Sequence, residues 1–132
     1  QMQEFEVGTF PSVQTNFIKR ACNHCTEASC QNVCPTGAIS KADGAHVVIN
    51  QEWCIGCGYC TTACPFGIPH FGEPKGSAQK CRFCYGTKAD EDPTACASAC
   101  PFGAITFGER DALAQAGRAR VAQLQAKGKA DA

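Results

Sequence analysis

Apolar residues in this chain come in short runs that are broken by glycine, proline and cysteine, so the pattern predicts small elements. Residues 1–20 hold scattered apolar side chains among polar ones: Phe5, Val7, Phe10, Val13, Phe17 and Ile18. We expect an extended lead-in here, with one short strand near residues 4–7. Its apolar side chains are expected to pack on the cysteine-rich lobe that follows.

A β-hairpin is predicted between residues 37 and 49. Residues 37–40 and 46–49 are short β-prone runs, and Asp43-Gly44 lies in the segment that joins them. An Asp-Gly pair between two such runs is a strong hairpin signal, because these residues tolerate the positive φ angles of a tight turn. The hairpin leads from one group of cysteines to the next.

The end of the chain has a helical pattern. From residue 109 to residue 127 the sequence is rich in alanine, and one stripe recurs at helical spacing: Leu113, Ala116, Arg120 with Val121, and Leu124. Acidic residues stand at the start of this segment and basic residues stand later, as the helix dipole prefers. We predict a docking helix within residues 109–132 that packs on the domain or on another subunit.

The composition limits the classes of partner. The chain has 132 residues, enough for one compact domain, and its 12 basic and 12 acidic residues give a formal net charge of +0. This balance gives no electrostatic reason to expect nucleic acid or an anionic membrane as a partner. No run approaches the ~18 apolar residues of a membrane-spanning helix. The first residue is Gln1 rather than Met, which indicates a processed chain or a fragment.

Cysteine dominates the candidate chemistry, with 12 residues in three groups that each begin C-x2-C and end C-x3-C-P. In chain order the groups are Cys22, Cys25, Cys30 and Cys34; Cys54, Cys57, Cys60 and Cys64; and Cys81, Cys84, Cys96 and Cys100. The middle group reads C-x2-C-x2-C-x3-C-P, the ligand run of a bacterial [4Fe–4S] ferredoxin. The polar insert of the last group, residues 85–95, is expected to form a surface excursion that contacts a partner.

Three kinds of chemistry compete for these cysteines. Disulfides follow no spacing rule and would not place a proline after the last cysteine of each group. Structural zinc would use two C-x2-C pairs, such as those that begin at Cys54 and Cys81, and would leave eight cysteines unused. Iron–sulfur ligation uses all twelve, so we favour it. His24 lies inside the first group, but Rieske centres take two histidines, so we expect a donor near sulfur or a surface group.

The x3 spacing predicts that each fourth cysteine leaves the cluster of its own group, because it sits one helical turn beyond the third and a proline then ends the helix. For cluster A we expect the ligands Cys22, Cys25, Cys30 and Cys64. For cluster B we expect Cys54, Cys57, Cys60 and Cys34. For cluster C we expect Cys81, Cys84 and Cys96, while Cys100 either completes cluster C or points to an additional cluster.

The order of these groups resembles the iron–sulfur (beta) subunit of the molybdopterin oxidoreductase family, including the beta subunits of formate dehydrogenase and of dimethyl sulfoxide reductase. The likeness is carried by Cys22-Asn23-His24-Cys25, by residues 33–38, 54–60 and 64–69, and by Lys80-Cys81. The x11 spacing and the Ala-rich ending favour formate dehydrogenase within that family. The near-repetition of residues 30–39 at residues 60–69 and 96–105 further implies pseudo-symmetric cluster lobes.

We therefore predict an α+β fold with tandem bacterial-ferredoxin-like lobes, in which short β-hairpins surround [4Fe–4S] clusters. The predicted segments are a lead-in at 1–20, a two-cluster lobe at 21–80, a second cluster lobe at 81–108 and a C-terminal docking helix at 109–132.

The resemblance implies a non-catalytic electron-transfer subunit of a bacterial, membrane-associated complex. Such a subunit passes single electrons between a molybdenum- or tungsten-pterin catalytic subunit and a membrane cytochrome, a quinone-linked subunit or another redox partner. A free-standing soluble polyferredoxin is the alternative, and size-exclusion chromatography of the native protein separates the two.

One departure from the family concerns Cys100. The family carries four cysteine motifs, and the first of them is absent here. We expect three [4Fe–4S] clusters on this chain and a fourth shared with a segment before Gln1, which would make the chain a fragment. The alternative is a closed three-cluster protein in which Cys100 completes its own motif. About twelve irons per chain, with Cys100 bonded to the Cys81 cluster, would favour that alternative.

Overall fold

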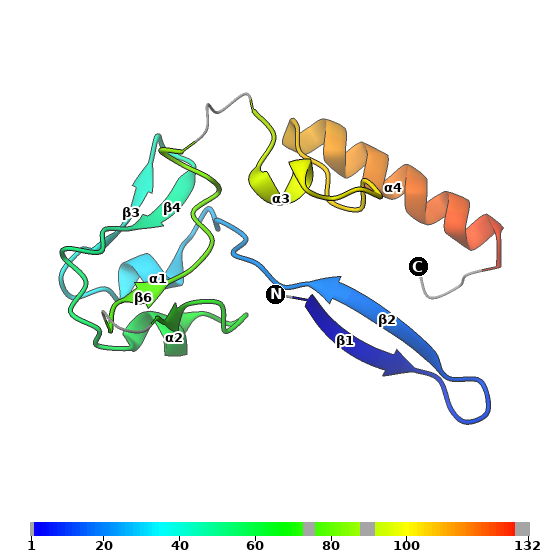
Figure 1. Ribbon diagram of the computed structural model, residues 1–132, viewed down its shortest axis with the longest axis horizontal. Helices are drawn as coiled ribbons and strands as arrows, with labels where there is room; N and C mark the ends of the chain where they lie inside the picture. Colours follow the sequence, from blue (N-terminus) through cyan, green and yellow to red (C-terminus); the bar gives the residue numbers. More distant parts are fainter. Residues whose placement is uncertain (1, 73–75, 88–91, 129–132) are drawn as a thin grey trace. The chain divides into compact units, whose positions relative to one another are not determined.

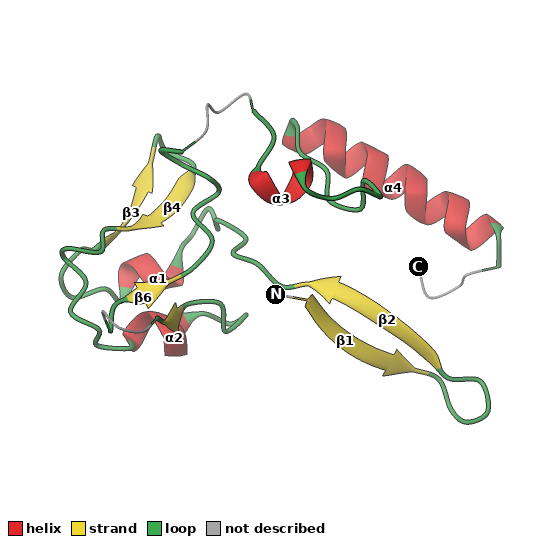
Figure 2. Cartoon of the chain, viewed as in Figure 1, coloured by secondary structure: helices red, strands yellow, loops and turns green. Residues whose placement is uncertain are grey.

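The computed structural model describes residues 2–72, 76–87 and 92–128, which form short helices and short antiparallel strand pairs (Figures 1 and 2). This agrees with the predicted α+β class. The chain divides into two compact units, Gln1–Phe83 and Cys84–Ala132. The tandem arrangement of cluster lobes and its segment limits stay predictions. Within the described ranges, no helix combines the length and the apolar character that crossing a bilayer requires.

Residues 2–19 form a hairpin. Strand β1 (Met2–Val7) pairs antiparallel with β2 (Gln14–Lys19), so that Met2 lies opposite Lys19 and Val7 opposite Gln14. The predicted strand near residues 4–7 is confirmed, but β2 was not predicted. The expectation that the apolar side chains pack on the following lobe is wrong, since Phe10 is 91% exposed and Phe17 65% exposed. The two strands pair their backbone groups with each other while these apolar side chains stay exposed.

The second hairpin confirms its prediction. Strand β3 (Ile39–Ala42) pairs antiparallel with β4 (His46–Ile49). Residues 43–45 join the strands, and the Ala45 N–H closes the turn by donating to the carbonyl oxygen of Ala42 at 3.1 Å. Its central residues, Asp43 and Gly44, have the positive φ angles expected of them, 48° and 73°. Because side chains alternate between the faces of a strand, Ile39 and Val47 both lie inward, with 4% and 1% of their surfaces exposed.

A single helical turn holds the third cysteine of each group. These helices are α1 (Ser29–Asn32), α2 (Tyr59–Ala63) and α3 (Ala95–Ser98), and each ends before the fourth cysteine. The helical turn predicted from the x3 spacing is therefore confirmed. Helices α1 and α2 pack against each other, and α1 also contacts β3 (Figure 1).

The interior of the first unit is small. The buried apolar residues among those described are Ala28, Ala38, Ile39, Val47, Cys60 and Ala78. Half-buried cysteines pack against this group: Cys25, Cys30, Cys34 and Cys54. A short pair, β5 (His70–Phe71) with β6 (Ala78–Gln79), supplies the buried Ala78. Cysteine thiols thus occupy the places that large apolar side chains fill in an ordinary core.

The second unit holds α3 and the C-terminal helix α4 (Arg110–Ala126). The helix predicted from the Ala-rich segment is confirmed, and Leu113 and Leu124 from its apolar stripe are half-buried. No residue of α4 is fully buried, so its docking role stays a prediction. The centre of the predicted surface excursion, residues 88–91, lies outside the described residues.

Candidate metal centres

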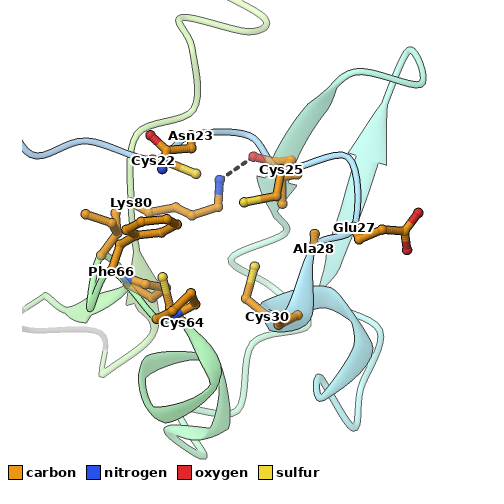
Figure 3. Close-up of a pocket in the computed structure, with 14 residues that line it drawn as sticks. Cys22, Asn23, Cys25, Glu27, Ala28, Cys30, Cys64, Phe66 and Lys80 are labelled. Carbon is orange, nitrogen blue, oxygen red and sulfur yellow. Dashed lines mark hydrogen bonds between the residues drawn. The ribbon is translucent and has the colours of Figure 1, made fainter.

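Four cysteines from two sequence groups surround a cavity of about 100 Å³ in the first unit. We call this cavity site A; its cysteines are Cys22, Cys25, Cys30 and Cys64. Figure 3 shows all four sulfur atoms turned toward one space, with Cys64 approaching from the segment after α2. Most of the remaining wall is apolar, from Ala28, Val47, Phe66, Ile68 and Pro69.

A second, smaller cavity of about 20 Å³ in this unit lies beside four further cysteines. We call it site B; its cysteines are Cys34, Cys54, Cys57 and Cys60. In both sites, the fourth cysteine of one group joins the first three of the other. Among the described residues, no three His, Cys, Asp or Glu side chains converge closely enough for a single metal ion. The cysteines instead surround a space, as a larger inorganic core requires.

The third group is divided between the two units, because Cys81 belongs to the first and the other three cysteines to the second. Cluster C therefore stays a prediction. At the start of α3, the Ala95 N–H donates to Cys84 Sγ at 3.4 Å. The Thr94 hydroxyl lies 3.3 Å from Cys96 Sγ. The start of this short helix therefore supplies hydrogen-bonding groups to two sulfur atoms of the group.

Backbone N–H groups point at the first cysteine of every group. His24 N donates to Cys22 Sγ and Phe83 N donates to Cys81 Sγ, each at 3.4 Å. In the middle group, the donor to Cys54 Sγ is Ala78 N, at 3.3 Å. In iron–sulfur sites, hydrogen bonds to the sulfur atoms are among the features that set the reduction potential of the cluster.

The residue before the second cysteine of each group adopts a left-handed backbone. It is Gly56 in the middle group (φ 72°), but His24 (φ 46°) and Phe83 (φ 60°) in the others. Non-glycine residues seldom adopt this conformation. The shared C-x2-C spacing places all three residues at one position of the ligand loop.

Gly56→Ala is expected to displace the ligand loop of site B. An added Cβ would lie 2.5 Å from the carbonyl oxygen of Gly76, in addition to the strain of a left-handed alanine, about 1–2 kcal/mol. Gly44→Ala is the matched control, because its φ of +73° carries the same strain and its Cβ meets nothing within 4 Å. Iron retention and denaturant unfolding should show a much larger loss for Gly56→Ala; equal losses in the two variants would contradict this geometry.

The fourth cysteines share one backbone turn. The carbonyl oxygens of Cys34, Cys64 and Cys100 each accept the N–H of the glycine three residues later, at 3.2, 3.0 and 3.2 Å. Those glycines, Gly37, Gly67 and Gly103, have φ angles of 65°, 57° and 61°. This common geometry is the structural counterpart of the repeated Cys-Pro-x-Gly sequence.

These turns also favour thiolates. Burial alone would raise the pKa of Cys34, but the Thr36 hydroxyl and the backbone N–H groups that follow outweigh it and lower that pKa. The pKa of Cys100 is lowered chiefly by the N–H groups of Ile105 and Ala104. Because the thiolate is the form that ligates metal, these two side chains are prepared as ligands.

At Cys30 and Cys60, by contrast, the pKa of the thiol is raised. Burial raises the pKa of Cys30, the charge of Lys80 lowers it, and the nearby thiolates of Cys22 and Cys64 raise it further. Burial likewise raises the pKa of Cys60, with added repulsion from the other thiolates of site B. Thiolates that repel one another around a cavity are stabilised by a cationic centre. The donor set of both sites therefore fits a [4Fe–4S] cluster.

His24 accepts the Val47 N–H on Nδ1 at 3.1 Å, so its neutral ring carries the proton on Nε2. Burial, followed by the charges of Lys80 and His46, lowers the pKa of His24 to about 4. The ring also meets Phe83 edge-on, with centroids 5.3 Å apart. His24 is thus half-buried rather than a surface group, and the group that donates to sulfur is its backbone N–H rather than its imidazole.

The sequence profile of the 4Fe-4S dicluster domain family matches residues 13–110. One chain of the anaerobic dimethyl sulfoxide reductase from Escherichia coli is 43% identical over 74 residues, which are 56% of this protein and 36% of the relative. One subunit of the sulfite dehydrogenase from Allochromatium vinosum is 41% identical over 85 residues, 64% of this protein and 35% of the relative. The thiosulfate reductase electron transfer subunit of Salmonella typhi is 42% identical over 72 residues, which are 54% of this protein and 38% of the relative.

These relatives confirm the predicted likeness to iron–sulfur subunits of molybdopterin oxidoreductases. The chain spans little more than a third of the length of each of the three. None of the three is named a formate dehydrogenase, so that narrower assignment stays a prediction.

Proposed function

The chain belongs to the 4Fe-4S dicluster domain family, and from that premise we propose that it is the electron-transfer part of an oxidoreductase complex. It carries several [4Fe–4S] clusters, as its twelve cysteines predict. A bound cluster of this kind takes up and releases one electron at a potential set by its surroundings. The observation that carries the proposal is the pair of four-cysteine sites in the first unit.

The proposed ligands follow the lining of the two sites. Site A would be held by Cys22, Cys25, Cys30 and Cys64, and site B by Cys54, Cys57, Cys60 and Cys34. A third cluster would be held by Cys81, Cys84 and Cys96, with Cys100 as its fourth ligand or as a ligand of an additional cluster. Because α1 packs on α2, the two sites share one small core, which suits transfer of an electron between them.

The chain's own residues would control access to these sites. Around site A the apolar wall from Val47, Ile68 and Pro69 limits entry of water. At site B, one ligand side chain reaches the surface, since Cys57 is exposed and its neighbours Ile55 and Tyr59 are 69% and 60% exposed. Electron exchange with a partner is therefore proposed at the Cys57 side.

The proposed partners are a molybdenum- or tungsten-pterin catalytic subunit and a membrane cytochrome, quinone-linked subunit or other redox partner. The names of the relatives support a catalytic partner that acts on a sulfoxide, on sulfite or on thiosulfate. A formate dehydrogenase catalytic subunit is the narrower proposal, because the x11 spacing and the Ala-rich ending favour it.

Purification of the native complex through this chain tests the proposal. We expect a larger subunit that contains molybdenum or tungsten to co-purify, with dye-linked activity toward one of four substrates: formate, dimethyl sulfoxide, sulfite or thiosulfate. The substrate that is turned over decides the narrower assignment. Elution of the iron-loaded chain on its own, without either metal, would support the free polyferredoxin instead.

A further inference from the structure

A lysine side chain enters site A. Lys80 lines the cavity together with its four cysteines. In Figure 3 this side chain extends across the space between the Cys22–Cys25 loop and Cys64. Its Nζ donates to the carbonyl oxygens of Val47 and of Cys81, the latter at 3.1 Å. The ammonium group is therefore held at the cavity by two backbone acceptors.

These contacts fix the position of the charge without cancelling it. The Val47 peptide is itself held at both ends, because its N–H donates to His24 Nδ1 at 3.1 Å while its carbonyl accepts from Lys80. Both acceptors of Lys80 are neutral carbonyl groups. The positive charge is accordingly left to act on the four cysteines with which Lys80 lines the cavity.

Among the described residues, the lining of site B contains no charged group apart from its four cysteines. The other residues of this lining are Thr36, Ala38, Ile39, Ile55, Gly58 and Ala78. Site A has one acidic neighbour, Glu27, but Figure 3 shows its carboxylate directed away from the cavity. Among the side chains that line the two sites in residues 2–72 and 76–87, Lys80 is thus the one that brings a formal positive charge to the space between cysteines.

We propose that Lys80 holds the reduction potential of the cluster in site A above that of the cluster in site B. This inference rests on the proposed electron-transfer function. A site that accepts one electron gains one negative charge and exchanges no proton, so a fixed cation beside it favours the reduced form. An electron that enters the first unit then resides preferentially on the cluster in site A. Lys80 thus acts on the cluster through its positive charge and takes no part in covalent chemistry.

Potentiometric titration of the iron-loaded chain, followed by electron paramagnetic resonance, tests the inference. Lys80→Gln should lower the ratio of reduced to oxidised cluster in site A about tenfold at a given potential, which is ~59 mV for one electron. The potential of site B should stay unchanged. Lys80→Arg, which keeps the charge, should retain most of the wild-type value.

Lys41→Gln is the matched control, because Lys41 Nζ also donates to a backbone carbonyl, that of Thr26 in the first cysteine group, but Lys41 does not line either site. Equal shifts in the two glutamine variants, or no shift in Lys80→Gln, would overturn the proposal.

The wild-type protein provides a test that needs no folded Lys80 variant. With the site A signal identified as the one that Cys64→Ala removes, site A must have the higher potential of the two. A lower or equal potential would refute the role of Lys80 while leaving the clusters and their function in place. Failure of the wild-type chain to bind any cluster would instead refute the proposed function.

Discussion

Replacing Cys64 with alanine is expected to remove the cluster held by the first cysteine group and to spare the cluster held by its own group. The reason is geometric: Cys64 lines site A with Cys22, Cys25 and Cys30, whereas Cys34 lines site B. The helical turn of α2 ends at Ala63, and the chain then carries Cys64 away from the other cysteines of its group. Loss of one of four ligands is expected to release about four irons, one cluster's worth, per chain.

Double variants show which cysteines from the two groups bind the same cluster. The double variant Cys22→Ala with Cys64→Ala should lose no more iron than either single variant, because both side chains serve one site. Cys22→Ala with Cys34→Ala should lose about twice as much, because two sites are damaged. The reverse pattern, in which Cys22 and Cys34 behave as one site, would show that each group closes its own cluster.

Removing the clusters is expected to unfold the cysteine-rich part of the chain, residues 21–107. The two largest buried side chains there, Ile39 and Val47, contribute about 3–6 kcal/mol together. Ordering the backbone costs about 1–2 kcal/mol per residue, so fewer than about ten residues already offset this gain. Metal ligation must therefore supply much of the folding free energy, as in other small metal-binding domains.

Hydrogen exchange before and after iron chelation under oxidising conditions measures this effect. The amides of α1, α2 and the β3–β4 hairpin should lose their protection together, and far-UV circular dichroism should change. Restoring iron and sulfide under reducing conditions is the control for irreversible damage and should recover the protection. An unchanged circular dichroism spectrum after complete cluster removal would contradict the prediction.

The sequence was most informative where local chemistry decides the structure. Asp43-Gly44 specifies its turn through positive φ angles, and the x3 spacing specifies one helical turn before each fourth cysteine. The Ala-rich segment specifies α4 in the same way. Each of these features depends on a few adjacent residues, so no knowledge of distant contacts was needed.

The sequence was less informative where distant residues meet. The partner strand β2 was missed because residues 14–19 do not show a period-two apolar pattern. Lys80 was noted as part of a motif, but its entry into site A depends on contacts with Val47, which lies 33 residues away. The left-handed backbone at His24 and Phe83 was missed because residue type alone argues against it.

Iron and acid-labile sulfide, counted per chain in protein prepared without oxygen, test the central claim most directly. Two four-cysteine sites of the kind described predict at least about eight irons and an equal number of sulfides, with more if the third group is also loaded. Zinc in place of iron, or iron without matching sulfide, would contradict the assignment of these cysteines to [4Fe–4S] clusters.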